Sequence, residues 1–120
     1  MQDRRSEVRM LCADMVEVSW TERSGRIRRA TALLEDIARS GACLQFESPV
    51  PVDTEVRIAC ANEILEGTVC YCVYREIGYF VGVKFVPGSE WSRRQYEPQH
   101  FLDLEEMVKK AGKKAGKQVH

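Results

Sequence analysis

The stretch VRIACANEILEGTVCYCVYREIGYFVGVKF, residues 56–85, decides the fold class of this chain. Apolar and polar residues alternate over residues 56–60, β-forming residues fill residues 65–74, and alternation returns over residues 79–85. Runs of this length, separated by short turn-forming segments, are typical of neighbouring β-strands. The stretch therefore predicts three consecutive strands of an antiparallel sheet.

The preceding residues predict three more strands by the same pattern. Residues 15–21 and 26–34 alternate on either side of a Ser-Gly turn and form a hairpin, whereas residues 35–41 are turn-like. Residues 42–46 alternate again until a proline-containing segment ends the strand. Six short strands at spacings of roughly ten residues predict a small antiparallel β-barrel that closes on itself, with a β-sandwich as the alternative.

The segment Gln99–Ala111 predicts a C-terminal α-helix that lies against the barrel, because its apolar residues recur at helical spacing after a proline. These apolar residues are Phe101, Leu104, Val108 and Ala111. We expect three parts along the chain: a flexible arginine-rich arm at 1–10, the barrel with its helix at 11–111, and a disordered basic tail at 112–120.

The composition is that of one folded domain, since 120 residues with 44% hydrophobic and 30% charged residues support a single core. Lys plus Arg and Asp plus Glu both number 18, so the net charge gives no reason for the surface as a whole to bind DNA, RNA or anionic lipid, and we expect no DNA or RNA partner. No apolar run approaches the roughly 18 residues of a membrane span, and the start lacks the apolar core of a signal peptide. We therefore expect a cytoplasmic protein without a membrane span. The five cysteines are an odd number, which favours free thiols over a disulfide framework.

The sequence motifs of common enzyme classes are missing from this chain. No nucleophile elbow, P-loop, dinucleotide fingerprint or zinc-protease motif occurs, and no Ser or Cys is locally paired with His100 or His120. Cys70 and Cys72 are separated by one residue instead of the two usual in a zinc-ligand pair, and no second pair follows. We therefore expect no enzymatic activity, no metal ion and no cofactor.

Two short motifs carry the functional signal: Arg4-Arg5-Ser6-Glu7-Val8-Arg9 at the start, and Asp36-Ile37-Ala38-Arg39-Ser40-Gly41 between the second and third predicted strands. Together with the late strand Val81–Phe85, they resemble the PilZ family. The pattern of that family is Arg-x-x-x-Arg ahead of a six-stranded barrel, then Asp/Asn-x-Ser-x-x-Gly about thirty residues later. The resemblance covers residues 3 to about 86 and implies a receptor for the bacterial messenger cyclic di-GMP.

The resemblance also implies a role for each residue of the two motifs. Arg5 and Arg9 carry guanidinium forks that match O6 and N7 of guanine, stack on purine rings or pair with a phosphate. An ionised Asp36 is a suitable acceptor for guanine N1-H and N2-H, which favours guanine over adenine. Gly41 is expected to adopt a φ above zero or to let the ligand approach the backbone closely. The implied ligand-binding residues are Arg4, Arg5, Arg9, Asp36, Ala38 and Gly41.

The chain departs from the family pattern at Ala38, where the motif has Ser. A neutral hydrogen bond contributes roughly 0.5–1.5 kcal/mol, so the missing hydroxyl weakens binding by about two- to ten-fold. Arg4 directly precedes the first motif arginine, and in the family such an extra arginine tends to accompany the binding of two stacked ligand molecules. One or two ligands per protomer are both compatible with the sequence.

The implied function is that of a receptor domain that changes conformation on binding cyclic di-GMP and signals to a separate protein partner, which the sequence does not identify. The alternative is a degenerate barrel that binds no nucleotide and acts as a protein-interaction module, which Ala38 favours. A barrel that binds single-stranded nucleic acid is the third reading. The small basic charge of the strands disfavours it.

Overall fold

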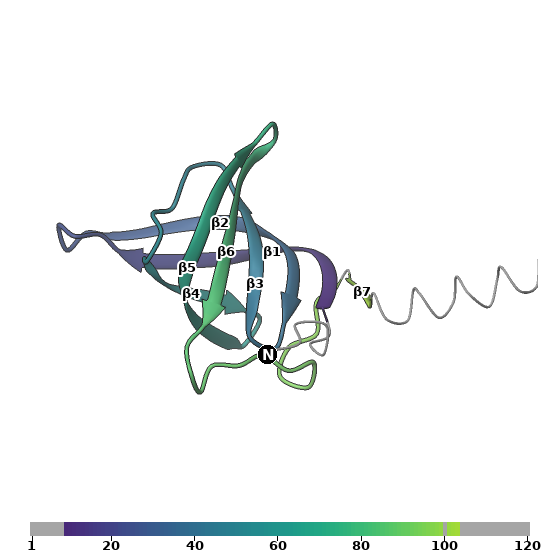
Figure 1. Cartoon of the computed structure of the whole chain (residues 1–120). Coiled ribbons are helices and arrows are strands. Elements are labelled where there is room, and N and C mark those ends of the chain that lie inside the picture. Colours follow the sequence, from purple (N-terminus) through teal and green to yellow (C-terminus); the bar gives the residue numbers. More distant parts are fainter. Residues whose placement is uncertain (1–8, 100, 104–120) are drawn as a thin grey trace, which may run out of the picture.

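Seven β-strands form the architecture of the computed structural model, which describes residues 9–99 and 101–103 (Figure 1). The strands are β1 (Arg9–Thr21), β2 (Ile27–Ala38), β3 (Gly41–Phe46), β4 (Glu55–Cys60), β5 (Glu63–Arg75), β6 (Gly78–Phe85) and β7 (Phe101–Asp103). The order across the sheet is β2-β3-β6-β5-β4-β1-β7, and the additional pairing of β1 with β2 closes the first six strands into a barrel. All of these pairings are antiparallel. The predicted six-stranded antiparallel barrel is confirmed.

β2 is longer than the alternation in the sequence predicts, because a β-bulge interrupts the alternation. The register between β2 and β3 shifts between Leu34 and Asp36, so the residue between them has no partner of its own on β3. An extra residue of this kind breaks the period of two that marks a strand. The turn predicted over residues 35–41 is therefore limited to Arg39 and Ser40, because β2 continues to Ala38 and β3 starts at Gly41.

A second bulge lies in β1, where the register against β2 shifts between Leu11 and Asp14. Before this bulge, Arg9 and Met10 already pair with β2. Met10 is 2% exposed and belongs to the core. The barrel therefore begins at Arg9, two residues before its expected start at residue 11.

The C-terminal prediction needs a correction at its start. Residues 101–103 form the short strand β7, which pairs with Met10–Cys12 of β1, so a helix does not begin at Gln99. β1 pairs with β4 only through Glu17–Ser19, which leaves the edge of its first half open for another strand. Residues 104–111 of the expected helix and the tail at 112–120 lie outside the described residues. Within residues 9–99 and 101–103, no helix would reach across a lipid bilayer.

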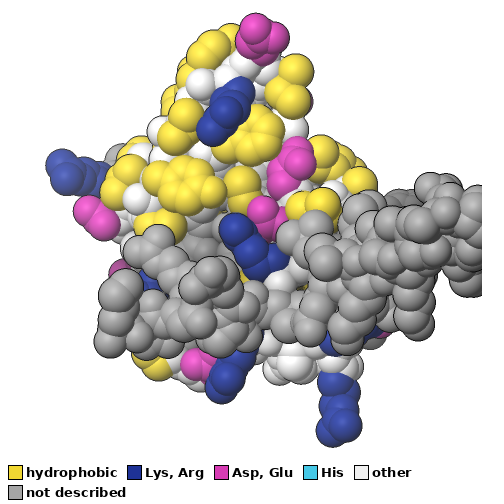
Figure 2. Space-filling model, turned by 45° about the vertical axis from the view of Figure 1, so that its right-hand side comes forward, with side chains coloured by type: hydrophobic (Ala, Val, Ile, Leu, Met, Phe, Trp, Pro, Cys, Tyr) yellow, Lys and Arg dark blue, Asp and Glu magenta, His cyan; other side chains and the backbone are white. Residues whose placement is uncertain are grey.

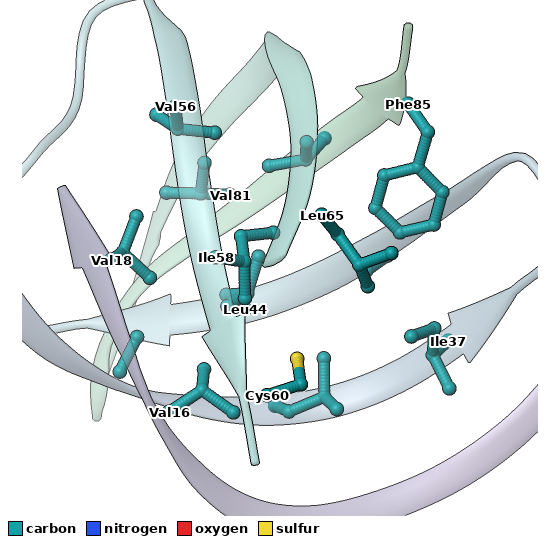
Figure 3. Close-up of a cluster of buried hydrophobic side chains, with 14 of the residues drawn as sticks. Val16, Val18, Ile37, Leu44, Val56, Ile58, Cys60, Leu65, Val81 and Phe85 are labelled. Carbon is teal, nitrogen blue, oxygen red and sulfur yellow. The ribbon is translucent and has the colours of Figure 1, made fainter. Parts of the chain in front are cut away.

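The interior of the barrel is filled by the inward-facing side chains of all six long strands (Figure 3). Leu34, Leu44, Ile58, Val69 and Val81 are 0% exposed. Burying an aliphatic side chain of this size contributes about 1.5–3 kcal/mol, so the alternating residues hold the strands together. Among the described residues, no buried side chain is polar or charged. A site for a polar ligand therefore lies on the outside of the barrel.

Two hairpins extend from the barrel (Figure 1). β5 pairs with β4 only through Glu63–Thr68 but with β6 as far as Arg75, so the outer part of the β5–β6 hairpin projects beyond β4. The β1–β2 hairpin projects on another side.

Candidate functional site

The barrel brings the two sequence motifs together because β1 and β2 are neighbours. Arg9 of the first motif pairs with Ala38 of the second, and Ala38 in turn pairs with Gly41 across the β2–β3 turn. The next outward-facing positions pair Leu11 with Asp36. Arg4 and Arg5 lie outside the described residues, so their roles remain predictions. The described motif residues thus occupy two neighbouring rows on one outer face.

The two rows continue across the sheet, because opposite residues of antiparallel strands share a face. We call them the Arg9 row and the Asp36 row. The Arg9 row runs from β1 to β6 through Arg9, Ala38, Gly41 and Lys84. The Asp36 row runs from β1 to β5 through Leu11, Asp36, Cys43, Gly82 and Tyr71.

Arg9 and Asp36 form an ion pair at the start of this face. Nη2 of Arg9 lies 3.6 Å from Oδ1 of Asp36, and the two side chains are 60% and 20% exposed. Burial raises the pKa of Asp36 above its ordinary value, and the charge of Arg9 opposes that rise only in part. A partly desolvated carboxylate next to a solvent-exposed cation is an acceptor that a ligand can use. Basic and acidic side chains lie next to each other on the face shown in Figure 2, below the hydrophobic side chains of the β5–β6 hairpin.

Tyr71 lies at the far end of the Asp36 row and reaches back across it. Its ring covers Gly82, where any β-carbon would overlap the ring atoms. Burial, and then a hydrogen bond that the phenol donates to the Cys43 sulfur, raise the pKa of Tyr71 to about 12. Cys43 is 8% exposed, and burial is also the main cause of its raised pKa. The surface in the middle of the Asp36 row is therefore formed by the small residues Cys43 and Gly82 and by the ring of Tyr71.

Sequence reasoning missed Cys43, Tyr71 and Lys84 as members of this face. Their place depends on the pairing of β3 with β6 and of β6 with β5, which joins residues far apart in the chain. One signal was available: a glycine inside a strand marks a close approach by another group, and Gly82 stands in the middle of an alternating strand.

The β2–β3 turn is held in place by the last residue of β6 and by the segment that follows it. The amide of Phe85 donates to the carbonyl of Ser40 at 2.8 Å, and the amide of Trp91 donates to the carbonyl of Arg39 at 3.0 Å. Further along, the hydroxyl of Tyr96 donates to Oδ2 of Asp14 at 2.7 Å. The two bonds to Ser40 and Arg39 therefore attach the β2–β3 turn, which belongs to the second motif, to the end of the barrel.

Gly41 serves the packing of the barrel rather than an unusual backbone conformation. Its φ is not among the positive values, which excludes the first of the two roles expected for this glycine and leaves the close approach of a ligand as a prediction. A β-carbon at this position would sit 2.5 Å from the carbonyl oxygen of Val83 on β6. Because the obstacle is backbone, it cannot rotate away. Gly41 is needed for the close approach of β3 to β6.

We expect Gly41→Ala to lower the free energy of unfolding by about 1–3 kcal/mol, because the added methyl group pushes β3 away from β6. Urea denaturation followed by circular dichroism measures the loss. A free energy of unfolding unchanged within about 0.5 kcal/mol would show that the two strands have room for the methyl group.

Metal binding has no support in the described ranges 9–99 and 101–103, which contain no group of three or more His, Cys, Asp or Glu able to hold an ion. All five cysteines are free thiols in the structure. Burial raises the pKa of Cys12 and of Cys60 to about 12, so neither is a reactive thiolate at neutral pH.

A hollow of about 1110 Å³ lies away from the motif residues. It is lined by the end of the β1–β2 hairpin, by residues 51–57 and by part of β5, and none of Arg9, Asp36 and Gly41 contributes to it. Arg23 and Arg29 face it together with Glu22 and Glu55, so it offers no single charge to a ligand. The outer face with the two rows remains the better candidate.

Comparisons with known proteins agree on the domain type. A family model described as PilZ domain matches residues 3–98. No curated protein matches the sequence. Among solved structures, the chain is similar to one described as the PilZ domain with c-di-GMP of YcgR from Escherichia coli, with a TM-score of 0.59 and 12% sequence identity. That match covers 96% of this chain and 99% of the other. At this identity the structural likeness concerns the fold.

Proposed function

Because this chain belongs to the PilZ domain family, we propose that it is a receptor for cyclic di-GMP that binds its ligand without chemical turnover. The observation that carries the proposal is the ion pair between Arg9 and Asp36, which joins the two motifs on one outer face. The similar PilZ domain of YcgR is described with cyclic di-GMP, which supports the same ligand class here.

The chemistry of guanine fits the Arg9–Asp36 pair. Guanine presents the acceptors O6 and N7 on one edge, which a guanidinium fork binds in a bidentate fashion. The neighbouring edge presents the donors N1-H and N2-H, which an ionised Asp36 accepts. In the ligand-free protein the two side chains neutralise each other, whereas one guanine base satisfies both. The phosphodiester groups of the ligand require further cations, and we assign this role to Lys84 of the Arg9 row and to Arg4 and Arg5.

Ala38 bears on the alternative of a barrel that has lost its ligand. The residue is 5% exposed and pairs with both Arg9 and Gly41, so it lies within the Arg9 row of the outer face with little surface of its own. A serine here would add one hydroxyl, and its absence weakens binding by about two- to ten-fold. Charge-assisted contacts of Arg9 and Asp36 are roughly twice as strong as the lost bond, so the proposal keeps ligand binding as the function.

We propose that the signal leaves through β1. Arg9 immediately precedes Met10–Cys12, the residues that pair with β7. If Arg9 exchanges Asp36 for the ligand, the start of β1 shifts between its two neighbouring strands. A binding event transmits information only when it favours one of two conformations, and a separate protein partner would read the difference.

The direct test is calorimetric titration of the full chain with cyclic di-GMP, with GTP and cyclic di-AMP as control nucleotides. The proposal expects saturable binding of cyclic di-GMP and none of the controls at the same concentration. The stoichiometry from the same titration, one or two ligands per protomer, shows whether a second, stacked molecule binds, as Arg4 suggests. No binding at high micromolar ligand would instead favour the interaction module.

Affinity for cyclic di-GMP is expected to fall as the pH is lowered from neutral, because the ligand requires an ionised Asp36 and its pKa is raised. The protein must then give up a proton from Asp36 to bind, and this costs more as the pH falls. The other titratable groups that interact with Asp36 are Arg9, Glu35, Cys12, Cys43 and Tyr71. Titrations of Glu35→Gln should keep the pH dependence, and titrations of Asp36→Asn should remove it. An affinity independent of pH in the parent protein would contradict the role of the carboxylate.

A further inference from the structure

We propose that Tyr71 is the stacking platform for the guanine base that Asp36 recognises, and that the ring determines how tightly this face holds a purine. The inference deepens the proposed function and rests on it. Nothing in the two sequence motifs points to Tyr71, which lies thirty residues or more beyond them on β5. Its candidacy comes from the register of four strands.

Tyr71 lies in the same cross-strand row as Asp36. Asp36 pairs with Cys43, Cys43 with Gly82, and Gly82 with Tyr71, so the carboxylate and the phenol belong to one straight row. The charge of Asp36 affects the ionisation of both the Tyr71 phenol and the Cys43 thiol, which places the phenol within its electrostatic reach. A base whose edge meets Asp36 extends over this row.

The ring of Tyr71 packs directly on the backbone of β6. Gly82 supplies bare backbone under the ring, because a β-carbon there would overlap its atoms. The Tyr71 phenol and the Cys43 thiol also influence each other's pKa, which places the phenol beside Cys43 in the row. A register shift in β5 between Val69 and Tyr71 aims the side chain at this place. Contact with Gly82, which pairs with Cys43, therefore positions the Tyr71 ring before any ligand binds.

The side chain of Tyr71 is also open to solvent. Tyr71 is 42% exposed although its ring rests on Gly82, so one side of the residue is on the protein and the other faces solvent. Aromatic rings with one free face are the usual platforms for unpaired bases, because every base has a π-face to stack on. The row thus offers Asp36 for the edge of the base and Tyr71 for its face.

The test compares three variants by calorimetric titration with cyclic di-GMP. Tyr71→Ala is expected to weaken binding about five- to 150-fold, whereas Tyr71→Phe keeps the ring and stays within about three-fold of the parent. The matched control is Val73→Ala. Val73 lies two residues after Tyr71 on the same face of β5, is 43% exposed and pairs with Phe80, outside the Asp36 row. This substitution should leave the affinity unchanged.

A spectroscopic readout separates contact with the ligand from support of the fold. The chain has four tyrosines, so fluorotyrosine labelling gives four ¹⁹F resonances, and Tyr71→Phe identifies the one from Tyr71. Cyclic di-GMP should shift this resonance more than the other three. If Tyr71→Ala fails to fold, the ¹⁹F experiment on the parent protein still decides.

The outcomes distinguish failure of the receptor function from failure of the role of Tyr71. Failure of the parent protein to bind cyclic di-GMP would remove the proposed function and this inference with it. Binding by the parent with equal affinity in Tyr71→Ala, or with an unmoved Tyr71 resonance, would leave the receptor intact and overturn the role of Tyr71 alone.

Discussion

Arg9→Ala is expected to weaken the binding of cyclic di-GMP by about ten- to 150-fold, which is one of the largest effects of a single substitution on this face. The variant removes a guanidinium that can form two charge-assisted hydrogen bonds with a guanine edge, and such bonds contribute about 1.5–3 kcal/mol. It also leaves the partly buried carboxylate of Asp36 without its cation. Calorimetric titration measures the change directly.

Arg57 provides a matched control for Arg9. Its Nε lies 3.5 Å from Oε2 of Glu66, and its side chain is 61% exposed, so the two arginines match in ion-pair distance and in exposure, although Glu66 is more exposed than Asp36. Arg57 lies on β4, away from both rows. Arg57→Ala should bind as the parent does. An equal loss in both variants would mean that the arginines act through general electrostatic attraction and not through a site.

Asp36→Asn is expected to weaken binding of cyclic di-GMP at least about ten-fold and, at the same time, to stabilise the fold at neutral pH. The loss follows because an amide offers one acceptor to the two guanine donors and turns its own donors toward them. A tenfold loss corresponds to about 1.4 kcal/mol. Selectivity for cyclic di-GMP over cyclic di-AMP should narrow as well, since the carboxylate favours guanine.

The stability change has a defined pH dependence. The pKa of Asp36 is raised in the folded protein, so this group favours the fold at acid pH and loses that contribution as the pH rises through its folded-state pKa. The melting temperature of Asp36→Asn relative to the parent should therefore increase from acid to neutral pH. A difference that does not vary with pH would show that burial of Asp36 carries no cost.

Much of the barrel followed from alternation, because strands buried on one face repeat every two residues. The exceptions have local causes. The bulges near Asp14 and Asp36 interrupt the period, so the ends of β1 and β2 looked like an arm and a turn. β7 was predicted as the start of a helix because its apolar spacing fits one, but pairing with the open edge of β1 makes it a strand.

The candidate site was predictable where it is local in sequence and not elsewhere. The motifs named Arg9, Asp36 and Gly41, although the structure gives Gly41 a packing role against β6. Tyr71 enters the site only through the registers of β3, β6 and β5, which no spacing within a motif reveals. Non-local pairing therefore set the limit of prediction.

The central claim is that cyclic di-GMP binds the outer face carrying the two rows, and the most direct measurement is a ¹H–¹⁵N correlation spectrum of the protein titrated with this ligand. We predict the largest amide shifts around Arg9, Asp36, Gly41 and Gly82, with small shifts at residues 51–57 in the hollow. Shifts concentrated at residues 51–57, with the Arg9 and Asp36 rows unchanged, would contradict the account.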